Sequence, residues 1–234
     1  MEITMAKTHE MDLCEGSLWK KILIFSIPLM FSNILQVLFN MSDVAVVGKF
    51  AGPIALGAVG STSILVTLFT GLLIGLASGV NALTALYIGS KSEKDVRETV
   101  HTAAILCLSA GVLICVLGIL FTRPVLTLMH TKEELIDGAV LYLRLYLLGM
   151  PALAVFNFGN AVLSAIGDTK RPLSYLSMAG VINVILNLFF VIVCKMDVAG
   201  VAVASITSQY ISAALVLRLL FTTTENYGLK PSCL

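Results

Sequence analysis

One carboxylate lies inside a long apolar run, and three amide side chains precede it at helical spacing. Asn33, Gln36, Asn40 and Asp43 occupy positions i, i+3, i+7 and i+10. At about 100° per residue, these side chains lie within roughly 80° of arc on a helix and form one polar stripe. Polar groups in hydrocarbon are unfavourable unless they face protein or water. The stripe therefore predicts a cavity lined by Asn33, Gln36 and Asn40, with Asp43 at its end.

Asp43 is the residue of this stripe with the clearest chemical role. A carboxylate at membrane depth is either ionised and paired or protonated, and a passing cation can exchange with either state. We therefore predict that Asp43 binds or couples a cation. Two alternatives remain open. Asn33 and Gln36 can act only as hydrogen-bonding groups between helices, and Asp43 can lie at the headgroup level, because it is near the end of its apolar run.

Later apolar runs carry further polar side chains. Asn183 and Asn187 are four residues apart and about 40° from each other on a helix, so their amide oxygens can coordinate a hard cation together. Asn157 and Asn160 share one flank of another run. The last run carries Ser205, Thr207, Ser208 and Gln209. Taken alone, Thr207 is better explained by a hydrogen bond to the carbonyl four residues earlier in its own helix.

Long apolar segments position these groups. Of 234 residues, 58% are hydrophobic and 12% are charged, whereas soluble domains have about 25% charged residues. Stretches without Asp, Glu, Lys or Arg cover 50–90, 99–122, 145–167, 172–194 and 198–217, and 22–48 contains only Asp43. About 20 apolar residues at 1.5 Å each cross a bilayer core of about 30 Å. The sequence therefore predicts an all-α, polytopic membrane protein with a bundle of six transmembrane helices.

The predicted organisation is a membrane lobe over 21–221 between an N-terminal segment, 1–20, and a tail, 222–234. We place its spans at about 22–48, 54–86, 98–121, 134–166, 172–194 and 198–220. Gly52 and Pro53 predict the turn between the first two spans. Pro28 and Pro151 predict helix bends in the first and fourth.

Glycines in the second span suggest close helix packing. Gly71, Gly75 and Gly79 recur at four-residue spacing, the pattern of small residues that lets membrane helices approach closely.

Basic residues predict the orientation. With six spans, ten of them fall on the side of the termini: Lys7, Lys20, Lys21, Lys91, Lys94, Arg97, Lys170, Arg171, Arg218 and Lys230. Five fall at or near the other side: Lys49, Arg123, Lys132, Arg144 and Lys195. The positive-inside rule then predicts a multi-pass protein of the cell membrane with both termini in the cytoplasm.

Other functional classes find little support. The chain has no HExxH, GxSxG, Walker or dinucleotide-binding motif, so we predict neither a catalytic site nor a cofactor, and no metal beyond a Na⁺ at the cation site. Without an ATP site, uphill transport must use an ion gradient. The net charge of +1 gives no indication of a nucleic-acid partner.

Several segments resemble one transporter family. They include SIPLMFSNILQVLFNMSDVAVVGKFAG, which ends the polar stripe at Asp43, the loop GDTKRP, and AGVINVILNLFF with its paired asparagines. The chain resembles the multidrug and toxic compound extrusion family over almost all of residues 15–220. The resemblance implies one six-helix lobe of a two-lobe exporter that exchanges Na⁺ or H⁺ for small organic, often cationic, compounds.

The resemblance also implies a set of site residues. By position, Asp43 is the acidic residue of a cation site, with Asn183, Asn187, Asn157 and Thr207 as its partners. Some relatives have an aspartate where this chain has Asn187, so the residues leave Na⁺ and H⁺ both open as the coupling ion.

The length departs from the family pattern, because family members have two such lobes in one chain. The chain ends at Leu234 after TTTENYGLKPSCL, which resembles the start of an inter-lobe connection. We expect either a truncated N-terminal half or a half-length chain that pairs with itself or with a separate second lobe. The alternatives are a non-transporting remnant, a lipid-linked sugar flippase and an ion channel.

Overall fold

The computed structural model describes residues 18–223 and 225–229. Its elements, in chain order, are α1 (Leu18–Val46), η1 (Val47–Ala51), α2 (Gly52–Gly89), α3 (Glu93–Leu128), α4 (Glu133–Leu147), α5 (Met150–Ala165), α6 (Lys170–Leu188), η2 (Phe189–Val193) and α7 (Asp197–Thr222). No strand occurs in this part of the chain, which confirms the all-α prediction. Residues 1–17 of the predicted N-terminal segment, residues 224 and 230–234 of the predicted tail, and the side chain of Asn33 lie outside the described residues.

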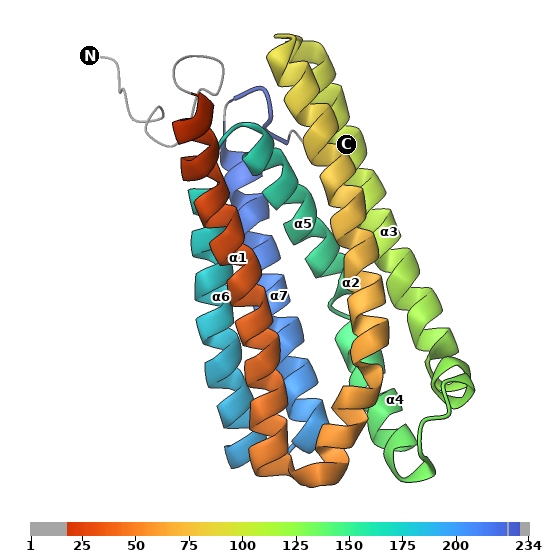
Figure 1. Ribbon diagram of the computed structural model, residues 1–234. Coiled ribbons are helices and arrows are strands. Elements are labelled where there is room, and N and C mark those ends of the chain that lie inside the picture. Colours follow the sequence, from red (N-terminus) through yellow and green to blue (C-terminus); the bar gives the residue numbers. More distant parts are fainter. Residues whose placement is uncertain (1–17, 224, 230–234) are drawn as a thin grey trace.

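The helices are long and apolar enough to cross a membrane. Four continuous helical stretches of the described chain meet this condition, and the pair α4 and α5, bent by 45°, makes a fifth. The longest stretch, Ser26–Gly89, contains both α1 and α2, which run in opposite directions (Figure 1). Six membrane-spanning segments therefore result, as the sequence predicts. How much of each helix lies within the bilayer stays a prediction.

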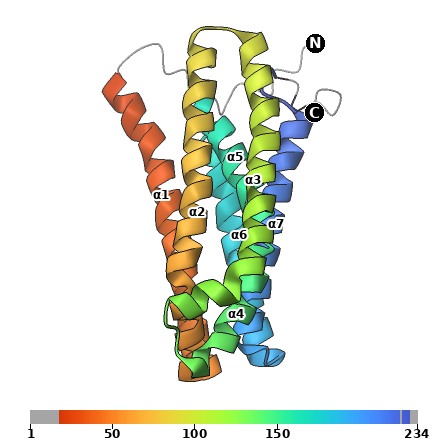
Figure 2. The same cartoon turned by 90° about the vertical axis from the view of Figure 1, so that its right-hand side faces the viewer.

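The turn between α1 and α2 is made by a π-helical segment and a glycine. After η1, Gly52 has a φ of 89°, which is a conformation that favours glycine. Pro53 follows in the first turn of α2, where its missing N–H leaves no helical hydrogen bond unmade. The turn predicted at Gly52 and Pro53 is therefore confirmed. Beyond it, α1 diverges from α2 (Figure 2).

The helices pack as two groups that meet along α5 and α7. α1, α6 and α7 form one group and α2, α3, α4 and α5 form the other, with α5 and α4 both packed on α7 (Figure 1). Two apolar clusters stabilise this arrangement, one towards each end of the molecule. Leu143, Leu147 and Val201 are fully buried in the first, and Phe158 and Val216 in the second.

The two predicted bend positions differ in the structure. α1 continues unbroken through Pro28, and the hydroxyl of Ser32 donates to the Pro28 carbonyl at 3.0 Å. Pro151 lies in the first turn of α5, directly after the break that separates α4 from α5.

The expectation that Gly71, Gly75 and Gly79 provide close packing is wrong for the described chain. No atom lies within 4 Å of the position that a Cβ would take at any of these three residues. The close approaches involve other glycines, because a repeat identifies a helix face but not the neighbour it meets. At Gly111 of α3, a Cβ would lie 2.9 Å from the Pro151 Cα and 3.0 Å from the Met150 carbonyl oxygen.

Candidate functional site

A cavity of about 160 Å³ lies where the two helix groups face each other. Its walls come from α1, α2, α4, α5, α6 and α7. The lining residues are Gln36, Phe39, Asn40, Asp43, Thr70, Ile74, Tyr146, Leu153, Phe156, Asn157, Leu176, Ala179, Gly180, Asn183, Ser205, Ser208, Gln209 and Ser212. Asp43 is the only charged residue in this set, so the cavity carries one carboxylate and no balancing cation.

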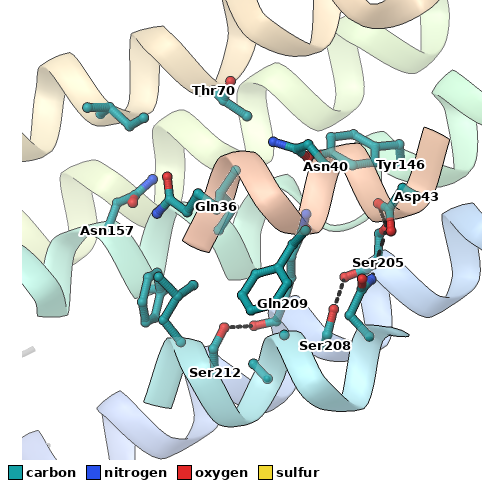
Figure 3. Close-up of a pocket in the computed structure, with 18 residues that line it drawn as sticks. Gln36, Asn40, Asp43, Thr70, Tyr146, Asn157, Ser205, Ser208, Gln209 and Ser212 are labelled. Atoms are coloured by element: carbon teal, nitrogen blue, oxygen red, sulfur yellow. Dashed lines mark hydrogen bonds between the residues drawn. The ribbon is translucent and has the colours of Figure 1, made fainter. Parts of the chain in front are cut away.

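The Asp43 side chain is buried and accepts hydrogen bonds from two other helices. Its relative exposure is 7%. Ser205 of α7 donates its hydroxyl to Asp43 Oδ2 at 2.9 Å (Figure 3). Asn187 of α6 donates its amide to Asp43 Oδ1. These contacts join α1, α6 and α7 at one point. This burial places the Asp43 carboxylate among protein groups.

The two asparagines of α6 extend this network. Asn187 also donates to Asn183 Oδ1 at 3.2 Å, and Asn183 donates to the Ser205 hydroxyl at 3.3 Å. Both side chains are buried, Asn187 completely. Asn187 Oδ1 has no hydrogen-bond partner among the described residues. A buried acceptor of this kind is rare in native proteins and requires an explanation, such as an ion or a water molecule.

Amide side chains that the sequence predicts to line a cavity lie along the cavity that contains Asp43. Gln36 and Asn40 of α1 line the cavity, as the stripe predicts. Asn157 of α5 also lines it, and its Nδ2 has no partner in the described part of the chain. In Figure 3, Gln36 and Asn157 lie towards one end of the cavity, and Asp43 and Ser205 lie towards the other. The structure thus brings Asn157 into the cavity without a hydrogen bond to the Asp43 network.

Of the residues that the resemblance implies, Thr207 lies outside both the Asp43 network and the cavity lining. Its hydroxyl donates to the Val203 carbonyl at 2.8 Å, and it does not line the cavity. Ser205 occupies the place on α7 that the resemblance gave to Thr207. Tyr146 of α4 is one of the lining residues that the sequence did not indicate; it is buried and lies beside Asp43 (Figure 3).

The donor set suits a hard cation or a proton better than redox or hydrolytic chemistry. Carboxylate, amide and hydroxyl oxygens are the groups that hard cations prefer. Asp43 provides such oxygens in the cavity, and Asn183, Ser205 and Ser208 also line it. In the described residues, no group of three or more His, Cys, Asp or Glu side chains could hold a transition metal.

Comparisons with known proteins agree with this architecture. The family model described as MatE matches residues 28–189. The probable multidrug resistance protein YpnP of Bacillus subtilis is 30% identical over 201 residues, which cover 86% of this chain and 45% of that protein. The probable multidrug resistance protein NorM of Thermotoga maritima is 26% identical over 219 residues, which cover 91% and 47%.

Solved structures share the fold. The outward-facing conformation of a multidrug resistance MATE family transporter of the MOP superfamily has a TM-score of 0.87 and 26% identity, and covers 95% of this chain and 49% of its own. MATE in the straight conformation has a TM-score of 0.86 with 26% identity, covering 93% and 48%. The chain spans about half the length of these relatives. On the match to residues 28–189, the chain belongs to the MatE family, the multidrug and toxic compound extrusion family that its motifs predict.

Proposed function

We propose that this chain forms the cation-coupling lobe of an exporter that exchanges Na⁺ or H⁺ for small organic compounds, with Asp43 as the coupling residue. The single observation that carries the proposal is the buried Asp43 carboxylate, which lines the cavity and accepts hydrogen bonds from Asn187 and Ser205. The names of the relatives, which include multidrug resistance proteins, support organic compounds as the exported class.

The proposed coupling arises because one carboxylate, that of Asp43, can bind either the coupling ion or an organic cation. A cation that enters the cavity neutralises Asp43 and uses Asn187 Oδ1 as a further ligand. Binding of the cation changes the packing of α1, which contains Pro28, and favours release of the organic compound on the outer side. An organic cation and the coupling ion then compete for the same charge. A ligand shifts the balance between two conformations only by its difference in affinity for them.

The lining of the cavity favours this reading over a sugar flippase. A lipid-linked sugar carries phosphate, which requires Lys or Arg side chains, and none of the eighteen residues that line the cavity is basic.

Because the chain spans about half of its relatives, we propose that transport requires a second lobe, either on the same polypeptide or on a separate chain. A chain without that lobe would be a non-transporting remnant, which is the second candidate.

The decisive experiment measures cation-driven ethidium efflux by cells that express the lobe together with a second lobe. Asp43→Asn keeps the size of the side chain and removes its charge, so we expect efflux driven by either Na⁺ or a pH gradient to be lost. Asp137→Asn is the matched control, because Asp137 is exposed and pairs with Arg123 at 3.3 Å away from the cavity.

Each outcome is informative. Loss of efflux in Asp43→Asn alone supports the proposal, and the gradient that drives the parent protein identifies the coupling ion. Unaltered efflux in Asp43→Asn would overturn the role of Asp43. Conductance without counter-transport would indicate a channel instead.

A further inference from the structure

The fourth membrane segment is interrupted inside the bundle. α4 ends at Leu147 and α5 begins at Met150, and the two helices meet at 45°. Pro151 has no N–H, so it cannot donate to the Leu147 carbonyl as a residue four positions later would in a straight helix. The break therefore leaves backbone acceptors that must find other donors in a membrane.

α7 supplies one of these donors. The hydroxyl of Tyr210 donates to the Leu148 carbonyl at 3.1 Å. The preceding residue, Gln209, packs directly on Gly149 in the break. A Cβ at Gly149 would lie 2.0 Å from Gln209 Oε1, so only a glycine allows this contact. Two consecutive residues of α7 thus contact the two residues that separate α4 from α5.

The same stretch of α7 carries the hydrogen bond to Asp43. Ser205 is four residues before Gln209, so the two side chains lie on the same face of α7. Ser205 donates to Asp43 Oδ2 at 2.9 Å at one end of this face, and Gln209 contacts Gly149 at the other. One rigid helical turn therefore separates the carboxylate contact from the break.

The last turn of α4 also borders the carboxylate. Tyr146 is buried, lines the cavity beside Asp43 and lies three residues before Gly149 (Figure 3). Both the helix that enters the break and the helix that packs on it thus contact the Asp43 site.

We propose that Gln209 and Tyr210 are positioning residues that couple the charge of Asp43 to the bend between α4 and α5. This inference rests on the proposed function of Asp43. A hydrogen bond to an ionised carboxylate is roughly twice as strong as one to a neutral group. Neutralisation of Asp43 by a bound cation weakens its hold on Ser205, so α7 shifts. Gln209 and Tyr210 move with α7 and change the angle of the break.

The test measures this angle and does not require transport. The full chain, with its five cysteines replaced, is placed in nanodiscs with spin labels at Leu141→Cys on α4 and Lys170→Cys after α5. Both positions are exposed. Asp43→Asn imitates the neutralised carboxylate whichever cation the transporter uses. Because α5 has 16 residues, it is about 24 Å long, and a change of about 10° displaces its far end by about 4 Å.

We expect Asp43→Asn to shift the mean distance between the labels by about 1 Å, because Leu141 lies only about 12 Å from the break and most of the displacement is perpendicular to the line between the labels. Tyr210→Phe removes only the donor to Leu148, and Gln209→Ala removes the contact with Gly149. Either substitution should reduce the shift caused by Asp43→Asn to less than half. Thr207→Val is the matched control on the same helix, because the Thr207 hydroxyl bonds only to Val203 among the described residues, and it should leave the shift unchanged.

The outcomes separate this inference from the proposed function. An unchanged distance in Asp43→Asn overturns the inference, even if the efflux assay shows that Asp43 is required. A shift that persists in both Tyr210→Phe and Gln209→Ala also overturns it, since α7 then does not transmit the change. If Gln209→Ala fails to fold, Tyr210→Phe decides alone. A shift together with unaltered efflux in Asp43→Asn would refute the proposed function and, with it, the coupling.

Discussion

At the scale of single residues, Asn187 links Asp43 to Asn183 while one of its own atoms has no partner among the described residues. Its amide nitrogen donates to Asp43 and to Asn183, and its carbonyl oxygen is buried without a hydrogen bond in the described chain. An unsatisfied buried acceptor costs about 1–3 kcal/mol. Under the proposed function, a cation that binds beside Asp43 and is also coordinated by this oxygen would recover that free energy.

A prediction about Asn187 follows at this scale. Asn187→Leu should lower the free energy of unfolding by about 1.5–3 kcal/mol, because a charged acceptor, Asp43, loses a buried donor. In an Asp43→Leu background the same substitution should cost less, giving a coupling of about 0.5–3 kcal/mol in a double-mutant cycle. Thermal unfolding in detergent, followed by size-exclusion chromatography, measures the shifts.

The control for this cycle is Asn160→Leu. Asn160 is half-buried and only accepts a long hydrogen bond of 3.5 Å from Ser164, so its loss should have a smaller effect. Strict additivity of the Asp43 and Asn187 substitutions would show that their contact contributes nothing to stability.

The sequence predicts this site only in part, and the limits are physical. The helical spacing of Gln36, Asn40 and Asp43 was enough to place them on one wall, and the spacing of Asn183 and Asn187 was enough to pair them. The sequence did not distinguish Ser205 from Thr207. These hydroxyls are about 200° apart on a helix. Which of them faces Asp43 depends on the rotation of α7, and that rotation is set by contacts with residues distant in sequence, such as those of Gln209 and Tyr210 with the α4–α5 break.

At the scale of helices, a glycine allows close packing only where a neighbouring element faces it. Gly111 lies against the backbone of the α4–α5 break, whereas Gly71 faces open space. Charge-free runs predicted the six membrane segments because each must be apolar over its full length. They could not predict the π-helical segments at Val47–Ala51 and Phe189–Val193, which depend on local helix geometry.

Two glycine substitutions should therefore have effects of opposite sign. Gly111→Ala places a Cβ against backbone atoms of α5 that cannot rotate away, and should lower stability by about 1–3 kcal/mol. Gly71→Ala meets no atom and gains helix propensity, so it should leave stability unchanged or raise it by up to about 1 kcal/mol. Thermal midpoints of the two variants in one detergent provide the comparison. Equal effects would show that α3 does not pack on the break as described.

At the scale of the whole molecule, the helices alternate in direction, so the connections gather at two ends. The start of α1, the α2–α3 turn, the α5–α6 turn and the end of α7 share one end (Figure 1). In the part of the chain that the structure describes, this end carries the basic residues Lys91, Lys94, Arg97, Lys170, Arg171 and Arg218. This arrangement supports the proposal, drawn from the positive-inside rule, that this end faces the cytoplasm.

A native cysteine makes this orientation testable. Cys194 is exposed at the opposite end, between η2 and α7. We expect a membrane-impermeant maleimide to label it in intact cells and Cys194→Ser to remove that label. Lys91→Cys, introduced into the Cys194→Ser protein, should react only after the cells are permeabilised. Labelling of Lys91→Cys in intact cells would mean that the lobe has the reverse orientation.

The position of Asp43 along α1 also has an electrical consequence. α1 ends at Val46, three residues beyond Asp43, which is about 5 Å along the helix. Moving one elementary charge across the full bilayer core, about 30 Å thick, changes its energy by about 2.3 kcal/mol per 100 mV. An ion that reaches Asp43 from the α1–α2 end crosses only about a sixth of that distance, or about 0.4 kcal/mol per 100 mV. Under the proposed function, with the membrane boundary at the end of α1, capture of the ion should therefore be nearly independent of membrane voltage. The later steps that carry the charge to the other side should bear most of the voltage dependence.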